Sequence, residues 1–432
     1  MIWFDVTDIL AWSRPPVGTI RTQVEIGNRL LEAYGAEMQF CAYQRDRFVP
    51  VGRERYRAAN AARAWSAVEQ LRAFYGFLLG QGPRFMVVPL RTAVARLKSV
   101  AMACSRRQHL ADKQFASPGD VYLSFGRDWE TPGKVADMGV LRRRGIHTIL
   151  CCFDMIPLQF PHYYGADVRD RFQRYLDVAL SVASTILCIS DCTKQDVGAY
   201  AAQQSARPPR LATVILGTDH LPVEADIAAP ILRPFILYVS TIERRKNHET
   251  LYQAYVTIRE KKLGEPPLCV LVGMETPRAH SVLVDISRDP RVHGDFVILD
   301  QASDAMLRWL YEHCLFTVFP SLYEGWGLRV AESLRHGKLV LASKASSLPE
   351  VGGTGAEYFD PWDVDAWARA IMFFATDHEA LRERESRIRR DFAPPLWQEC
   401  LEVVRFEIAH LRGRAGGEAG GQAASETRER KG

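Results

Sequence analysis

The sequence predicts an α/β protein with two doubly wound parallel sheets facing each other across a cleft. Short apolar runs alternate with helical patterns along the chain, which is typical of parallel sheets with helices on both faces. The alternation stops once, at a proline-rich stretch, and then resumes. A chain of 432 residues is too long for one ordinary core and suits two or three domains.

The first half of the chain supplies one predicted sheet. Helices are expected over Thr22–Tyr34, whose apolar residues recur at helical spacing, and from Asp191, directly after a strand. Strands are expected where apolar runs end at polar residues, over residues 1–7, 120–125, 147–154, 184–190 and 211–216.

Gly217–Pro234 is rich in proline and small residues and is interpreted as an interdomain linker. A second alternating set follows, with strands at 235–240, 268–273, 296–300, 315–319 and 338–343. We therefore expect domains at 1–222 and 223–392, an amphipathic helix within 393–412, and a disordered tail at 413–432. Ligands in open α/β sheets bind beyond the carboxyl ends of the strands, so the site is expected between the domains.

Composition and charge narrow the class of protein. Hydrophobic content of 47% and charged content of 25% are ordinary for a soluble protein, and a net charge of +4 is too small to imply nucleic acid. The nine cysteines show no disulfide or zinc spacing, which favours reduced thiols and a cytoplasmic location. Neither a signal peptide nor an apolar run of about 20 residues is found, so membrane contact is expected to be peripheral.

Two glutamates, Glu324 and Glu332, stand eight positions apart around a glycine-rich turn. Gly325 and Gly327 let the backbone approach a ligand closely, and a helix is expected over about 328–336. The N-terminus of that helix directs free N–H groups and partial positive charge into the cleft, which favours a diphosphate. On these residues alone, a capping acid followed by a solvent-facing acid is an equally good interpretation.

A basic cluster, Arg244–Asn247, follows a strand at the start of the next expected helix. Cations there oppose the helix dipole, so the position is unfavourable unless an anion binds. The fork of Arg245 and the point charge of Lys246 suit a leaving diphosphate. A solvated basic turn is the alternative, and the neighbouring glutamate motif argues against it.

These segments resemble a known family. "PSLYEGWGLRVAESLRHGKLVLASKASSLPEVGG" and "ILYVSTIERRKN" are similar to the donor-binding signatures of family 4 retaining glycosyltransferases, which have the GT-B fold. The spacing of Glu324 and Glu332 is the hallmark of that family. "DVTDILAWSRPPVGTIR", "CFDMIPLQFPHYY" and "LCISDCTKQDV" extend the resemblance to about residues 3–410. The resemblance implies a hexosyltransferase of bacterial polysaccharide or O-antigen assembly, and a last helix that crosses back onto the first domain.

The resemblance also implies roles for individual residues. Glu324 would contact the hydroxyls of the donor sugar, and Glu332 those of the ribose. Lys246, with Arg245 nearby, would neutralise the leaving diphosphate, while Asp154 would lie near the reacting carbon or the acceptor. Asp154, Lys246 and Glu324 are thus the expected catalytic residues. Backbone groups would approach the donor at Gly18, Gly325, Trp326, Gly327 and Leu328.

Departures from the family pattern concern the phosphate contacts. Ser240 and Thr241 stand where Gly and Arg are frequent, and Phe153 stands where His is frequent. Arg329 stands where Pro is common, and a cation at that helix N-terminus can add a phosphate contact. No metal or other cofactor is predicted, because the acids of Asp363–Asp365 open a helical run and are expected to cap it.

Residues 52–113 are rich in arginine, with apolar residues interleaved. They are interpreted either as a solvated helical insertion or as a basic surface resting on anionic lipid. We prefer the second, because the resemblance implies a lipid-linked or glycan acceptor at the inner face of the cytoplasmic membrane. Nucleic acid is not an expected partner, since acids interrupt the basic segment and no aromatic stacking pattern accompanies it.

The expected donor is a nucleotide-sugar. GDP-mannose is favoured by the resemblance to mannosyltransferases, and UDP- and dTDP-sugars stay open. The alternative function is a catalytically silent relative that acts as a binding or scaffold subunit. The intact set of Glu324, Glu332 and Lys246 argues against that alternative, because decay of the activity would be expected to damage it.

Overall fold

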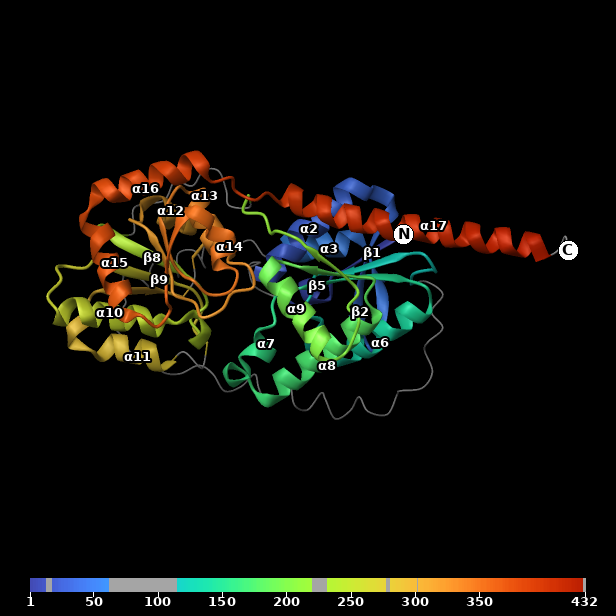
Figure 1. The fold of residues 1–432 in the computed structure, drawn as a ribbon, viewed down its shortest axis with the longest axis horizontal. Coiled ribbons are helices and arrows are strands. Elements are labelled where there is room, and N and C mark those ends of the chain that lie inside the picture. Colours follow the sequence, from blue (N-terminus) through green and yellow to red (C-terminus); the bar gives the residue numbers. More distant parts are fainter. Residues whose placement is uncertain (13–17, 62–114, 220–230, 277–279, 301, 430–432) are drawn as a thin grey trace.

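The computed structural model describes residues 1–12, 18–61, 115–219, 231–276, 280–300 and 302–429. For residues 414–429 it describes the backbone alone. Two separate sheets divide these residues into an N-domain and a C-domain (Figure 1). The predicted domain boundary at 222/223, most of the arginine-rich segment 52–113 and part of the predicted linker lie outside the described residues.

The N-domain sheet has the order β3-β2-β1-β4-β5-β6-β7, and every neighbouring pair is parallel except β2 with β3. The strands are β1 (Ile2–Asp5), β2 (Met38–Gln44), β3 (Arg47–Val51), β4 (Val121–Ser124), β5 (His147–Cys152), β6 (Thr185–Cys188) and β7 (Arg210–Thr213). The helices are α1 (Thr7–Ala11), α2 (Gly18–Tyr34), α3 (Arg53–Ala61), α6 (Pro132–Arg143), α7 (Ile156–Gln159), α8 (Ala166–Val182) and α9 (Asp191–Gln203).

Helices bury both faces of the N-domain sheet. Apolar residues of α2 and α3 share one core with β1 and β2, while those of α6, α8 and α9 fill the other face. The two sets of helices lie on opposite sides of the sheet (Figure 1). Burial on both faces explains why strands such as β5 and β6 are continuous apolar runs. The antiparallel hairpin β2–β3 was not predicted, and it makes the sheet mixed rather than purely parallel.

The C-domain sheet is parallel throughout, in the order β10-β9-β8-β11-β12-β13. Its strands are β8 (Phe235–Val239), β9 (Leu268–Val272), β10 (Phe296–Leu299), β11 (Thr317–Phe319), β12 (Val340–Ser343) and β13 (Ala356–Phe359). Its helices are α10 (His248–Glu260), α11 (His280–Arg288), α12 (Asp304–His313), α13 (Leu328–Arg335), α14 (Leu348–Gly352), α15 (Val364–Thr376) and α16 (His378–Asp391). Strand order reverses between β8 and β11, which is where ligands of doubly wound sheets bind.

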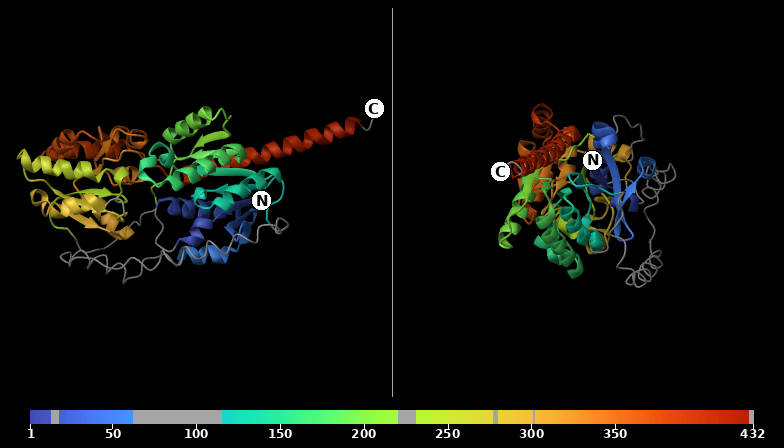
Figure 2. Two further views of the ribbon diagram at one scale, coloured as in Figure 1. Left: turned by 90° about the horizontal axis from the view of Figure 1, so that it is seen from below. Right: turned by 90° about the vertical axis from the view of Figure 1, so that its right-hand side faces the viewer.

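The last helix, α17 (Trp397–Glu429), returns to the N-domain and packs against α2 (Figure 2). Buried Glu407 accepts hydrogen bonds from Arg210 and Thr185 of the N-domain. The expectation of disorder at 413–432 is wrong up to Glu429, because the helix continues through that residue. Nucleation is the costly step of helix formation, and the packed segment up to about residue 412 supplies the nucleus from which the tail extends.

No helix in the described ranges combines the length and the apolarity needed to cross a bilayer.

Candidate active site

The loop after β8 places Lys246 at the cleft. It passes through a short 3-10 turn, Arg244–Lys246, and reaches α10 through Asn247, whose backbone is left-handed with φ of 55°. The Asn247 amide donates to the carbonyls of Pro320 and Pro361 at 3.0 and 2.8 Å. These bonds tie the basic turn to the loop that follows β11, so the two predicted motifs are fixed side by side.

The loop after β11 carries Glu324 and ends at Gly327. Gly327 has φ of 101° and stands directly before α13, a backbone conformation that L side chains rarely adopt. Ser347 donates its hydroxyl to the carbonyls of Glu324 and Trp326 at 2.9 and 2.8 Å, and Ser346 accepts from the Glu324 N–H at 2.7 Å. The loop is therefore held rigidly at the carboxyl end of the sheet.

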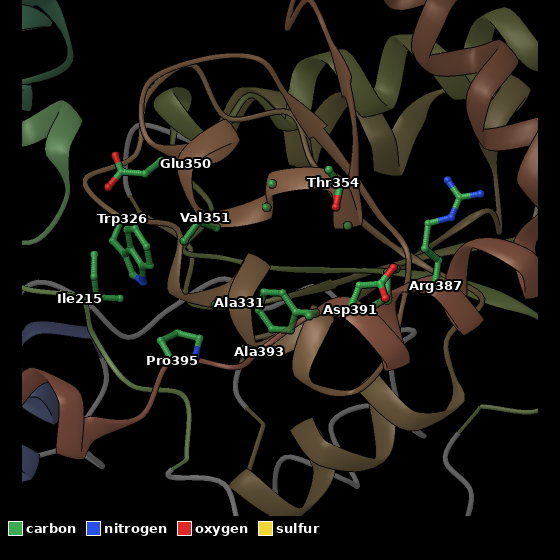
Figure 3. Close-up of a pocket in the computed structure, with 15 residues that line it drawn as sticks. Ile215, Trp326, Ala331, Glu350, Val351, Thr354, Arg387, Asp391, Ala393 and Pro395 are labelled. Carbon is green, nitrogen blue, oxygen red and sulfur yellow. The ribbon is translucent and has the colours of Figure 1, made fainter.

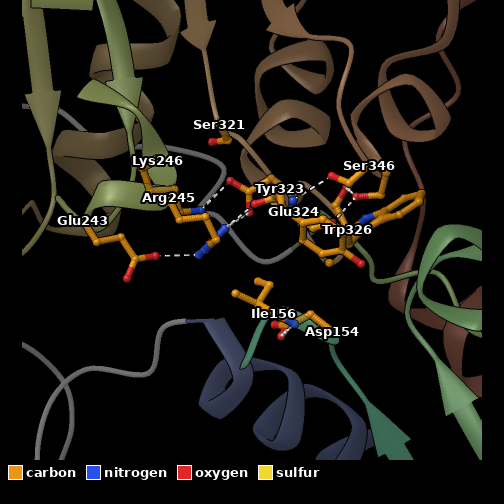
Figure 4. Close-up of polar contacts among 12 residues, drawn as sticks. Asp154, Ile156, Glu243, Arg245, Lys246, Ser321, Tyr323, Glu324, Trp326 and Ser346 are labelled. Carbon is orange, nitrogen blue, oxygen red and sulfur yellow. Dashed lines mark hydrogen bonds and ion pairs between the residues drawn. The ribbon is translucent and has the colours of Figure 1, made fainter. Parts of the chain in front are cut away.

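Glu324 is the centre of a partly buried ion cluster (Figure 4). Lys246 Nζ lies 2.6 Å from Glu324 Oε1, and Arg245 Nη1 lies 3.1 Å from Oε2. Arg245 also pairs with Glu243 at 2.6 Å. Burial by itself would raise the pKa of Glu324, but Lys246 and Arg245 outweigh it and lower that pKa to about 2. Glu324 is thus an ionised acceptor at neutral pH.

Asp154 faces this cluster from the N-domain, across the cleft (Figure 4). It follows β5, and its carboxylate accepts from the Ile156 N–H at 3.0 Å. Burial raises the pKa of Asp154, and Arg245 opposes that rise. The two domains approach closely beside it: a Cβ on Gly325 would lie 2.1 Å from the Phe153 carbonyl oxygen.

A cavity of about 560 Å³ lies between the domains and gathers most of the predicted residues. Asp154, Lys246 and Glu324 line it, as do the serine and threonine that depart from the family pattern, Ser240 and Thr241. The backbone positions predicted to approach a donor are also in its wall, namely Gly18, Gly325, Trp326, Gly327 and Leu328. The structure thus brings residues from distant parts of the sequence to one interdomain space.

Two predicted residues do not line the cavity. Arg245 lies behind Glu324, where its Nη1 also donates to the Tyr323 carbonyl at 2.5 Å. Glu332 has no exposed surface and is paired with Arg329, which does line the cavity. The spacing of the two glutamates therefore places them on one loop and helix, while only Glu324 reaches the space between the domains.

Residues 225–391 match the family model described as "Glycosyl transferases group 1". The matched residues are about two fifths of the chain, and they are similar to a group 1 glycosyl transferase domain. The match confirms the predicted family resemblance for the C-domain, where both basic and acidic motifs lie.

Three similar proteins extend this identification. The chain is 27% identical over 300 residues to "Serotype-specific mannosyltransferase WbdA" of Escherichia coli, covering 66% of this chain and 36% of the relative. It is 30% identical over 224 residues to "O-antigen chain mannosyltransferase B" of the same species, covering 49% and 57%. The chain thus spans about a third of the length of the first of these.

The fold is similar to that of sucrose-phosphate synthase from Thermosynechococcus elongatus. The TM-score is 0.62 at 16% identity, and the likeness covers 96% of this chain and 99% of that one. It confirms the predicted GT-B class, two Rossmann-like domains facing each other across a cleft.

Two residues in the wall of the interdomain cavity were not predicted from the sequence. Arg21 of α2 pairs with Asp304 of α12 at 3.0 Å, so an ion pair joins the two domains across the cleft. Gly273 follows β9 with φ of 152°, and a Cβ there would lie 1.9 Å from the Ser240 carbonyl oxygen. A glycine directly after a strand was a usable signal for Gly273, whereas nothing local relates Arg21 to a residue 283 positions away.

Trp326 also lines a second cavity, of about 370 Å³ (Figure 3). Its wall includes the glycine turn 352–355 together with Ile215 and Pro395. Trp326 lines both cavities, and its buried indole Nε1 has no hydrogen-bond partner among the described residues. The side chain therefore separates the interdomain space from the junction where the chain recrosses to the N-domain.

Of the two acids at 363–365, Asp363 has the capping role that the sequence predicted, whereas Asp365 pairs with Lys261 at 2.7 Å. Asp363 accepts from the Ala366 N–H at 2.9 Å and caps α15. In the described part of the chain, no group of three or more His, Cys, Asp or Glu side chains is placed to hold a metal ion.

His248 makes the stability of the group 1 domain depend on pH. Burial, followed by Lys246, lowers the pKa of His248 to about 3 from 6.5. Between pH 3 and pH 6.5, His248 is therefore protonated in the unfolded chain and neutral in the folded chain. The free energy of unfolding falls as the pH drops below 6.5. We expect wild type to lose about 2 kcal/mol more unfolding free energy than His248→Gln between pH 7 and pH 5.

Urea denaturation at the two pH values measures this difference. His378→Gln is the matched control, because His378 is exposed at the start of α16. Equal losses in wild type and His248→Gln would contradict a neutral, buried His248.

Proposed function

We propose that this protein is a retaining glycosyltransferase. It moves a sugar from a nucleotide-diphosphate sugar to a lipid-linked or glycan acceptor in cell-surface glycan assembly. The observation that carries the proposal is the Lys246–Glu324 pair, 2.6 Å apart in an interdomain cavity beside the N-terminus of α13. A cation and free helix N–H groups at one wall suit a diphosphate, and an ionised carboxylate next to them suits sugar hydroxyls.

The proposed roles follow from charge development. As the bond from the anomeric carbon to the diphosphate breaks, positive charge grows on the sugar and negative charge on the leaving group. Lys246 and the α13 N-terminus stabilise that negative charge. Arg245 adds a second positive charge from outside the cavity wall, where it pairs with Glu324. Glu324 accepts hydrogen bonds from the sugar and so orients the donor. It does not act as a proton donor, in keeping with its pKa of about 2.

The acceptor side is proposed to involve Asp154. Asp154 lines the cavity from the N-domain, where it can orient the acceptor hydroxyl toward the anomeric carbon. The acceptor oxygen attacks from the face that the diphosphate leaves, and its proton passes to the departing phosphate oxygen. Configuration at the anomeric carbon is then retained without a covalent enzyme intermediate. No step in this scheme requires a metal.

The donor is proposed to be GDP-mannose. Support comes from the two E. coli relatives, which are both named mannosyltransferases. The cysteines in the described ranges are free thiols, which fits a reducing compartment such as the cytoplasm. The basic segment 52–113 is proposed to rest on anionic lipid where a lipid-linked acceptor resides.

A thermal-shift panel with GDP, UDP and dTDP, each with its sugar conjugates, tests the proposed function. A ligand at 100 times its Kd adds about 2.7 kcal/mol to the stability of the folded state, so GDP and GDP-mannose are expected to raise Tm by several degrees. Sugar release from the stabilising donor, followed by mass spectrometry of the product, then tests transfer. Stabilisation by no nucleotide would instead favour a silent binding or scaffold subunit.

A further inference from the structure

Glu332 is shielded from the interdomain cavity by Arg329. The Tyr311 hydroxyl donates to Glu332 Oε2 at 3.0 Å, and Arg329 Nη1 lies 2.8 and 2.6 Å from the two carboxylate oxygens. The Glu332 side chain is fully buried, whereas the Arg329 side chain is 24% exposed and lines the cavity. A ligand in the cavity therefore meets Arg329 before it reaches Glu332.

Arg329 keeps donors for a ligand. A guanidinium carries five N–H groups in a rigid planar fork. Nη1 serves Glu332, and among the described residues Nε and Nη2 of Arg329 donate to no protein atom. Glu332 thus fixes one nitrogen of a side chain that lines the cavity, and the other two nitrogens keep their hydrogen-bond donors.

Arg329 carries a positive charge at neutral pH. Burial opposes that charge, but Glu332 outweighs burial and, with Tyr311 and Asp304, keeps the pKa of Arg329 above its ordinary value. Asp304 is the neighbouring acid in the cavity wall, and it is already paired with Arg21 at 3.0 Å. The negative charge of Asp304, which would repel an anionic ligand near Arg329, is thus compensated by Arg21 of the other domain.

We propose that Arg329 contacts a phosphate oxygen of the nucleotide-sugar donor, and that Glu332 is a positioning residue for Arg329 instead of a ribose contact. The inference rests on the proposed function and deepens it. A guanidinium only donates hydrogen bonds, so phosphate oxygens are its best partners, and charge-assisted bonds of this kind are short and strong. Glu332 acts through Arg329, because its own oxygens are occupied.

Isothermal titration calorimetry on the full chain tests the assignment. The ligands are the nucleoside, its monophosphate, its diphosphate and the 2′-deoxy diphosphate of whichever base stabilises the wild type. Arg329→Gln is expected to weaken diphosphate binding about 10- to 100-fold and to leave nucleoside binding within about twofold. Glu332→Gln is expected to weaken diphosphate binding less, with the ratio of ribo to deoxy affinity unchanged.

A double variant separates a positioning role from a direct contact. In the Arg329→Gln background, Glu332→Gln is expected to have no further effect on the diphosphate Kd, because its influence passes through Arg329. The double variant also removes both charges together, which avoids leaving one buried charge unpaired. Arg308→Gln is the matched control, since Arg308 is equally exposed at 24%, pairs with Glu312 at 2.7 Å and lies outside the cavity wall.

Three outcomes would overturn the inference. The inference is overturned if Glu332→Gln weakens the binding of nucleoside and of diphosphate equally, or if it abolishes the preference for the ribose over the deoxyribose ligand. Wild-type diphosphate affinity in Arg329→Gln overturns it directly. Failure of the wild type to bind any nucleotide removes the proposed function first, and the inference with it, so the two failures are distinguishable.

Discussion

Gly325→Ala is expected to lower kcat/KM for glycosyl transfer about 100-fold or more while both domains stay folded. The added Cβ would lie 2.1 Å from the Phe153 carbonyl oxygen and 3.2 Å from Asp154 Cβ, in the opposite domain. Neither neighbour is a flexible side-chain end, so the domains must separate, and a displacement of about 1 Å from productive geometry can cost about 100-fold in rate. Thr193 also loses its bond to the Gly325 carbonyl, now 3.3 Å.

Steady-state kinetics and small-angle scattering measure the two parts of this expectation. The radius of gyration is expected to rise, because the clash lies between domains, and Tm is expected to change little. Gly52→Ala is the matched control, since a Cβ there meets no atom within 4 Å. Normal turnover by Gly325→Ala would show that the close approach of the two domains is dispensable for the reaction.

Lys246→Ala is expected to lower kcat by about 100- to 1,000-fold, because it removes the cation aimed at the leaving diphosphate. Glu324 keeps Arg245 at 3.1 Å, so no unpaired buried charge remains and the fold should persist. Glu324→Gln is expected to lower kcat by a similar factor, because it weakens the hydrogen bonds that orient the donor sugar. Because the pKa of Glu324 is about 2, its titration should leave no step in the wild-type rate profile between pH 5 and 8.

Single-turnover kinetics across that pH range separate chemistry from product release. Lys344→Ala is the control lysine, an exposed residue of the same domain that pairs with Asp360 at 3.2 Å. A kcat for Lys246→Ala within a few-fold of wild type would remove Lys246 from the leaving-group site.

The sheets were largely predictable because parallel strands are buried on both faces. Strands such as β8 and β9 are unbroken apolar runs, and the polar residues after them mark the carboxyl ends. The hairpin β2–β3 was missed at its turn, where Arg45 and Asp46 have φ of 52° and 57°. Such two-residue turns usually carry Asn-Gly or Asp-Gly, so Arg-Asp gave no signal. The helical tail was missed because its small and polar residues were judged by composition alone, although an amphipathic helix was expected directly before them.

The candidate site was predictable only within each domain. The glycine turn and the basic turn sit on neighbouring strands of one sheet, so Glu324 and Lys246 were expected together, and they are 2.6 Å apart. The position of Glu332 behind Arg329 depends on side-chain packing around Tyr311, which spacing does not encode. The Arg21–Asp304 pair depends on how two domains meet, and no local pattern reports that.

The return of α17 to the N-domain has a mechanical consequence. β1 belongs to the N-domain sheet, and Arg412 in the middle of α17 pairs with Glu37 of the N-domain at 2.9 Å, so chain segments before and after the C-domain both belong to the N-domain (Figure 1). The C-domain is a loop of chain inserted between those segments. A pulling force applied between β1 and the packed part of α17 would load the N-domain first. A surface attachment through either segment would hold the same half of the molecule.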